Sequence, residues 1–270
     1  MRPRQPTPQS GFSLLELALV VIIIGLILGG IAVGRGLIKS SQLQAVAGEY
    51  ARHVAAVKAF QEKYLEMPGD FAGATDIWGA LNNTPANCIT IASPNTVGTC
   101  NGDGNGTITT QSGGAYATTY YEQFRAWQHL ANAGLISGSY SGVSTSGTYR
   151  YTIGTNIPSS SMDGGGWRLI HYTPVDQALG VAGLPALTAG DIPYNLVLWF
   201  GGAYVGDSNL MGSIISPSDA FDLDTKIDDG RPNTGKLVSQ SNTAPIDCAT
   251  GDVYNQNDND TCALVFKTGL

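Results

Sequence analysis

The sequence predicts an α+β fold, in which a long N-terminal α-helix serving as membrane anchor and spine packs on a C-terminal antiparallel β-sheet head with extra short helices. Three observations predict this arrangement. Residues 12–34 form an almost uninterrupted apolar stretch, and residues 35–67 continue it with apolar side chains at steps of three or four. Residues 68–270 contain short aromatic and β-branched segments bounded by Gly, Ser and Pro, which is typical of strands joined by turns.

The apolar stretch 12–34 is long enough to cross a lipid bilayer. At about 1.5 Å per residue it makes a helix of roughly 34 Å, and the hydrocarbon core is about 30 Å thick. Its one ionisable side chain is Glu16. A carboxylate in hydrocarbon is costly, so Glu16 is predicted to have a partner. Arg2 and Arg4 precede the stretch, which favours a cytoplasmic amino terminus and an exported remainder.

Residues 35–67 are predicted to extend the same helix as an amphipathic segment. Its apolar face comprises Leu43, Val46, Tyr50, Val54, Val57, Phe60 and Tyr64. Its polar face comprises Arg52, Lys58, Glu62 and Lys63. The helix is expected to end near Glu66, because Pro68 disfavours helical geometry in the residue before it and Gly69 lets the chain turn.

The head is predicted to mix helices and strands. One helix candidate covers residues 119–130 and is closed by Gly134. Another starts at Ser216, with Ser as the cap and Pro217 in the first turn. The predicted strands are 148–153, 167–173 and 195–200.

Composition and motifs exclude several function classes. The net charge is −7, and Lys and Arg form no cluster beyond the first residues, so no nucleic acid partner is expected. The sequence has no HExxH and no phosphate-binding loop. The closest approach to a nucleophile elbow, GSYSG, has Tyr140 where the nucleophilic Ser belongs. We therefore expect a protein that is not an enzyme.

The sequence GFSLLE at residues 11–16, after a basic leader and before an apolar helix, resembles the processing site of type IV prepilins and of the pseudopilins of type II secretion. The resemblance implies that residues 1–11 are a leader peptide, which a prepilin peptidase removes between Gly11 and Phe12. It also implies that the new amino group of Phe12 is methylated. Glu16 would then pair with the amino terminus of a neighbouring subunit during assembly, which suits a charge that is tolerable only when paired.

The same resemblance implies an organisation and a location. Residues 12–34 form the transmembrane half of the helix, residues 35–67 its amphipathic half and residues 68–270 the globular head. Before assembly the chain crosses the inner membrane once, with its head in the periplasm. It then enters an extracellular pilus or a periplasmic pseudopilus. The expected partners are other pilin or pseudopilin subunits, the prepilin peptidase and an inner-membrane assembly platform.

Two functions remain open on this resemblance. The first is a structural subunit of a type IV pilus or related filament, which a large head with disulfides favours. The alternative is a pseudopilin of a type II secretion system, which the absence of Pro between Phe12 and Met67 favours, because many pilins carry a Pro near the membrane exit. Four phrases in the head, MPGD, NGDGNG, AWQHLANAGLI and KIDDGRPNTG, also resemble prepilin-like sequences with larger heads.

The four cysteines are Cys88, Cys100, Cys248 and Cys262, which allow three connectivities. Disulfides are predicted, because the inferred topology places the head in an oxidising compartment and pairing of sequence neighbours closes two loops of modest size. Zinc is disfavoured, since the sequence has no CxxC and its three histidines are dispersed. The pair Cys248 and Cys262 resembles the carboxy-terminal disulfide loop of type IV pilins.

The segment CNGDGNGTI places oxygen-bearing side chains at alternate positions, with Asn101, Asp103 and Asn105 followed by Gly106. This is the spacing of the first half of a calcium loop, in which alternating oxygens wrap the cation and Gly permits a sharp turn. Asn101 stands where Asp is usual, and Ser112 stands where a Glu would close the loop. Weak calcium binding is one interpretation, and an Asn/Gly-rich turn is the other.

A second acidic group lies in the sequence DAFDLDTKIDDG. Helical spacing directs Asp222 and Asp224 to different sides, so a site using every aspartate of the group is not expected. Asp228 and Asp229, at the helix end, are the better metal candidates, either there or as distant ligands that complete the shell of the 101–105 loop. A solvated acidic face is the alternative.

Overall fold

The computed structural model describes residues 13–80, 98–108, 122–143, 151–171, 196–203, 211–241 and 248–270. The chain forms two compact units, one reaching Gln42 and the other, the head unit, running from Leu43 to Leu270. Helix α1 (Leu14–Tyr64) contributes its first half to one and its second half to the other. The predicted head began at residue 68, whereas the compact unit begins at Leu43, because the amphipathic half of α1 is part of the core of the head unit.

The first half of α1 is apolar and exposed. Its exposed large hydrophobic side chains include Leu14, Leu15, Leu17, Ile22, Leu26, Ile31, Val33, Leu37 and Ile38. A window of this helix with mean hydropathy 2.9 is long and apolar enough to cross a membrane. A contiguous exposed apolar surface of this kind is typical of a membrane or protein interaction surface.

The second half of α1 packs into the head unit, as its amphipathic pattern predicts. Val46, Val57 and Phe60 are fully buried. The ring of Tyr50 stacks on Phe266 with centroids 4.9 Å apart, and its hydroxyl donates to the carbonyl of Lys267 at 2.9 Å. These contacts hold the helix on the last strand of the chain.

Helix α1 ends at Tyr64, slightly before the predicted end near Glu66. The next residue, Leu65, has a φ of 60°, and its amide donates to the carbonyl of Gln61 at 2.8 Å. A left-handed residue commonly ends a helix, and here it stops α1 ahead of Pro68.

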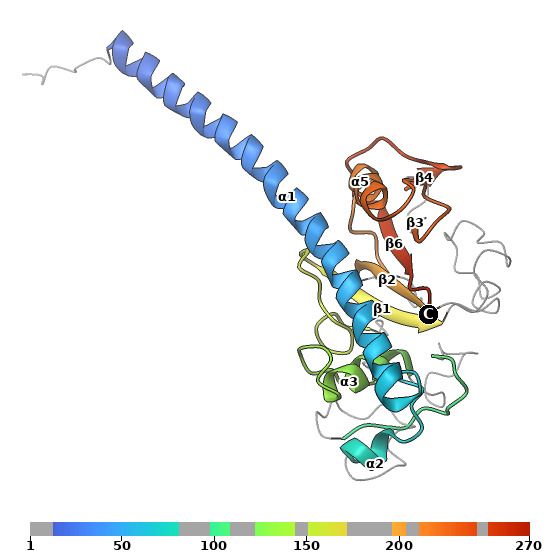
Figure 1. Ribbon diagram of the computed structural model, residues 1–270. Coiled ribbons are helices and arrows are strands. Elements are labelled where there is room, and N and C mark those ends of the chain that lie inside the picture. Colours follow the sequence, from blue (N-terminus) through green and yellow to red (C-terminus); the bar gives the residue numbers. More distant parts are fainter. Residues whose placement is uncertain are drawn as a thin grey trace, which may run out of the picture. The chain divides into compact units, whose positions relative to one another are not determined.

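Four strands form one antiparallel sheet in the order β1-β2-β6-β3 (Figure 1). Their bounds are β1 Gly165–His171, β2 Leu196–Gly202, β6 Cys262–Lys267 and β3 Leu237–Ser241. The central register pairs Leu198 with Leu169 of β1 and with Phe266 of β6. All residues of β1 and β2 are buried. Strands β4 (Ala249–Thr250) and β5 (Val253–Tyr254) form a separate small hairpin.

Two of the three predicted strands are confirmed, as β1 and β2. The third, 148–153, is not: residues 144–150 lie outside the described part of the chain, and Ile153 forms only an isolated bridge with Ile157. Strands β3, β4, β5 and β6 were not predicted.

Both predicted helices of the head are confirmed. They are α3 (Glu122–Asn132) and α5 (Pro217–Ile227), and a third, α2 (Ala74–Trp78), is short. Ser216 caps α5 by accepting a hydrogen bond from the Asp219 amide at 3.3 Å, as the sequence indicated. Gly134 follows α3 with a φ of 74°, the conformation that favours glycine after a helix.

Candidate functional site

The turn after α1, the loop 98–108 and helix α3 meet at one place in the head unit. The amide of Gly69 donates to Nδ1 of His129 at 3.0 Å, and the amide of Gly104 donates to the carbonyl of Asp70 at 3.1 Å. A Cβ at Gly102 would collide with the backbone of Asp70, so this close approach requires glycine. Three phrases noted in the sequence, MPGD, NGDGNG and AWQHLANAGLI, are thereby brought together.

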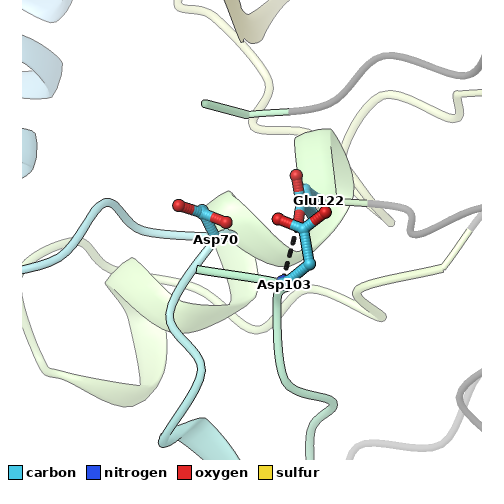
Figure 2. A group of neighbouring side chains, drawn as sticks. All are labelled: Asp70, Asp103 and Glu122. Carbon is cyan, nitrogen blue, oxygen red and sulfur yellow. Dashed lines mark hydrogen bonds between the residues drawn. The ribbon is translucent and has the colours of Figure 1, made fainter. Parts of the chain in front are cut away.

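Three carboxylates lie at this junction: Asp70 from the turn, Asp103 from the loop and Glu122 from the first position of α3 (Figure 2). One oxygen of each lies within 4.8 Å of the others. Asp70 and Glu122 are buried, whereas Asp103 is exposed. We call these residues the Asp70 cluster.

Backbone amides hold the buried members of the Asp70 cluster in place. The amides of Asn105 and Gly106 donate to the two oxygens of Asp70 at 3.1 and 2.7 Å. The amide of Asp103 donates to Oε1 of Glu122 at 3.1 Å, the bond drawn in Figure 2. The loop therefore wraps around the carboxylates, and Asp103 leaves the cluster open to solvent on one side.

The electrostatics of the Asp70 cluster favour a bound positive charge. Burial is the largest cause that raises the pKa of Asp70, and the charge of Glu122 and the contact with Asp103 add to it, so that this pKa reaches about 7 although the Gly106 amide lowers it. Carboxylates this close cannot all ionise without compensation. A proton on Asp70 or a cation between the three groups supplies it.

The predicted calcium ligands are only partly brought together. Asp103 belongs to the cluster, but Oδ1 of Asn101 accepts the amide of Thr75 in α2 at 2.7 Å. Oδ1 of Asn105 accepts the amide of Thr107 at 2.8 Å. The two Asn oxygens thus form turn and helix contacts, and the acidic residues that join Asp103 come from other segments.

Asp228 and Asp229 lie with Asp224 in a separate group and not at the 101–105 loop. Asp70 and Glu122 were not predicted as site residues, because Asp70 directly follows the predicted end of the long helix and Glu122 lies within the predicted helix 119–130. No local spacing in the sequence relates Asp70 and Glu122 to Asp103, because the three residues lie in separate segments.

His129 is a structural residue at this junction. Its Nδ1 accepts the Gly69 amide, and its Nε2 lies 3.1 Å from the carbonyl of Cys100 and 3.0 Å from the Thr99 hydroxyl. Because a carbonyl only accepts, Nε2 carries the proton. Burial and then the charge of Arg125 lower the pKa of His129 to about 3, although the hydrogen bond with the Cys100 carbonyl raises it. The imidazole is therefore neutral, and its hydrogen bonds connect α3 to the turn after α1 and to the loop 98–108.

At the amino-terminal end of α1, Glu16 has a partner within its own chain. The amide of Ser13 donates to Oε2 of Glu16 at 2.8 Å, and the amide of Leu15 donates to the Ser13 hydroxyl at 3.2 Å. This is the reciprocal part of a capping box. Gly11 and Phe12 lie outside the described residues, so the predicted pairing with a Phe12 amine stays a prediction.

The predicted disulfide between Cys248 and Cys262 is present, with Cα atoms 4.9 Å apart. It joins the segment before β4 to the first residue of β6. Cys100 is also disulfide-bonded, and Cys88 lies outside the described part of the chain.

Comparison with known proteins gives no relative for this chain. No family model, no curated protein and no solved structure matches it. Its function is therefore inferred from its own residues and their geometry.

Proposed function

We propose that this chain is a structural subunit of a type IV pilus or related filament, cleaved after Gly11, methylated on Phe12 and assembled through α1. One observation carries the proposal: the first half of α1 exposes apolar side chains along its length and holds one carboxylate, Glu16, while the same helix continues into the core of the head. Such a surface is stable in lipid before assembly and among neighbouring apolar helices afterwards. The proposed role is structural and not enzymatic.

The proposal assigns a specific role in assembly to Glu16. The Ser13 amide satisfies one oxygen of Glu16 but leaves its charge uncompensated. An amino group on Phe12 of a neighbouring subunit supplies the missing charge in the filament, because an ion pair is far cheaper than a lone carboxylate away from water.

The test is the Glu16→Ala variant beside Glu62→Ala, which removes an exposed carboxylate from the polar face of the same helix. We expect Glu16→Ala to insert and to be cleaved, yet to accumulate as processed monomer in the inner membrane, while Glu62→Ala assembles normally. Mass spectrometry of the amino terminus and the yield of sheared filaments are the measurements. Wild-type filament yield from Glu16→Ala would refute the pairing, and an intact Met1 terminus on assembled protein would refute the processing.

A pseudopilin of a type II secretion system is the second candidate, and the unbroken α1 without Pro favours it. Deleting the chain distinguishes the two functions, because each predicts a different defect. Deleting a pilus subunit abolishes surface filaments, whereas deleting a pseudopilin abolishes export of folded proteins and leaves the pili intact.

We also infer that the head binds calcium at the Asp70 cluster. Three carboxylates within 4.8 Å supply hard oxygen ligands, and Asp103 keeps one side open for water, which calcium accepts in its shell of about six to eight oxygens. Calcium replaces the proton that Asp70 otherwise holds. The bound ion would join the end of α1, the loop 98–108 and α3, and so stabilise the head after export.

A further inference from the structure

Two basic side chains, Arg35 and Lys39, follow the apolar stretch of α1 and precede the head unit, which begins at Leu43. Both are exposed. They are four residues apart in one helix, so they project on the same side of it. Every other side chain of residues 17–48 is uncharged. We call Arg35 and Lys39 the basic pair.

The apolar surface of α1 continues past the first member of the basic pair. Leu37 and Ile38 are 68% and 62% exposed, and the helical repeat directs Leu37 to the side opposite the pair. From Leu14 to Ile38 the helix is roughly 36 Å long at about 1.5 Å per residue, whereas a hydrocarbon core is about 30 Å thick. In a bilayer that α1 spans, the basic pair therefore lies at the depth of the lipid phosphates.

The side chains of the basic pair suit this depth. An arginine or lysine at the edge of the hydrocarbon keeps its aliphatic part among the acyl chains and extends its charged end to the headgroups. The guanidinium of Arg35 offers paired N–H donors that match two oxygens of a phosphodiester. Lys39 adds a second positive charge one helical turn further along.

The distribution of charge along the chain assigns any attraction to an anionic membrane to this pair. Residues 43–270 carry 20 acidic and 10 basic side chains, so the head unit as a whole is repelled by a negative surface. No acidic side chain occurs in residues 17–48 to offset the basic pair. Each basic side chain close to an anionic leaflet strengthens binding about fivefold.

We propose that Arg35 and Lys39 bind the headgroup of an anionic phospholipid of the phosphatidylglycerol type, at the membrane surface where α1 leaves the hydrocarbon. The inference rests on the proposed membrane-anchored state of the chain, and it holds equally for a pilus subunit and a pseudopilin. It concerns the subunit before assembly, when lipid surrounds the apolar half of α1.

The bound headgroup sets the depth of α1 in the membrane. Glu16 lies roughly 29 Å from Arg35 along the helix axis, at about 1.5 Å per residue. This distance is close to the thickness of the hydrocarbon core, about 30 Å. With Arg35 held at one phosphate layer, the carboxylate of Glu16 is kept near the opposite boundary of the bilayer, where an uncompensated charge costs least.

The test uses the full chain in nanodiscs that contain equal amounts of phosphatidylglycerol and phosphatidylcholine. Both lipids have a phosphodiester, but only phosphatidylglycerol has a net negative charge. Native mass spectrometry identifies the lipids that remain bound to the released chain. The double variant Arg35→Gln with Lys39→Gln is compared with Arg52→Gln with Lys58→Gln, which removes two exposed basic side chains from the second half of α1.

We expect the wild-type chain to retain phosphatidylglycerol over phosphatidylcholine by about tenfold or more, and the Arg52 and Lys58 double variant to behave in the same way. The double variant of the basic pair should retain the two lipids equally. Arg35→Lys should keep part of the preference, because it preserves the charge and loses the paired donors. Equal preference in the two double variants overturns the proposal.

Two further outcomes separate this inference from the proposals on which it rests. A wild-type chain that enters the nanodiscs but retains both lipids equally overturns this inference alone. A chain that does not enter them contradicts the membrane-anchored state as well. If the basic pair is needed instead for self-association of the chain in detergent, and lipid preference is absent, an acidic surface of a second copy binds these residues and the lipid proposal is wrong.

Discussion

The buried carboxylate of Glu49 in α1 accepts the indole N–H of Trp167 in β1 at 2.8 Å, across 118 residues of chain. The hydroxyls of Ser160 and Ser161 donate to the same carboxylate, each at 2.6 Å. Burial raises the pKa of Glu49, but these hydrogen bonds outweigh it and the net pKa is lowered. An ionised side chain on the buried face of α1 therefore fixes the rotation of the helix against the sheet.

The first prediction concerns this contact. The carboxylate accepts two hydrogen bonds on each oxygen, so Glu49→Gln replaces one oxygen by an amide N–H that faces two donors, and we expect it to cost about 2–3 kcal/mol of unfolding free energy. Glu62→Gln, on the exposed face, is the control and should change little. Because the folded pKa lies below the ordinary value of 4.5, the contribution of Glu49 is present above that pH and lost as pH falls further. Urea unfolding measures both effects, and equal costs for the two variants would contradict the prediction.

Calcium should raise the thermal stability of the head by mass action. A ligand that binds only the folded state stabilises it increasingly as its concentration exceeds the dissociation constant. We expect a higher Tm in millimolar calcium than in excess chelator, and a smaller difference for Asp103→Ala. Asp163→Ala removes an exposed carboxylate outside the Asp70 cluster and should keep the full response. An unchanged Tm in the two buffers would mean that the Asp70 cluster binds no calcium.

Acid should destabilise the head through its buried histidines. The pKa of folded His129 is about 3, against 6.5 for a free imidazole, so between these values the unfolded chain binds more protons. Stability is therefore full above pH 6.5 and falls toward pH 3, by at most about 1.4 kcal/mol per pH unit for each such group. His129→Gln should be less stable at pH 7.5 yet show a shallower decline to pH 5 in urea unfolding. A slope equal to that of the wild type would exclude His129 as a source of acid sensitivity.

Leu65 carries backbone strain that a glycine would remove. Its φ is 60° and its side chain is exposed, so little apolar burial is lost on truncation. A left-handed L-residue costs roughly 1–2 kcal/mol, part of which the extra flexibility of unfolded glycine offsets. We expect Leu65→Gly to stabilise the head unit by about 0.5–1 kcal/mol, whereas Leu65→Ala keeps the strain and gives no gain. Equal unfolding midpoints for the two variants would show that the turn is not strained.

Local features were predictable from the sequence because they depend on neighbouring residues. The length and hydropathy of residues 12–34 predicted an apolar helix, and the spacing of Val46, Val57 and Phe60 predicted which face of α1 is buried. The Ser216 cap of α5 and the Cys248–Cys262 pairing also follow from short-range patterns. Glu49 was not predicted to lie on the buried face, because no local sequence pattern connects it to the residues that donate hydrogen bonds to its carboxylate.

The tertiary structure alone decided which carboxylates meet. Asp103 was a candidate from loop spacing, but Glu122 is 19 residues away along the chain, and Asp70 reaches the loop through amides 35 and 36 residues away. These residues, distant in the sequence, come together in space because the glycines of the loop pack directly on the turn after α1. Sequence by itself thus determined the helix, its apolar half and its caps, which local backbone and side-chain preferences control. Chain reversals and sheet packing determined the acidic clusters, because contacts between distant segments form only when the whole head is folded.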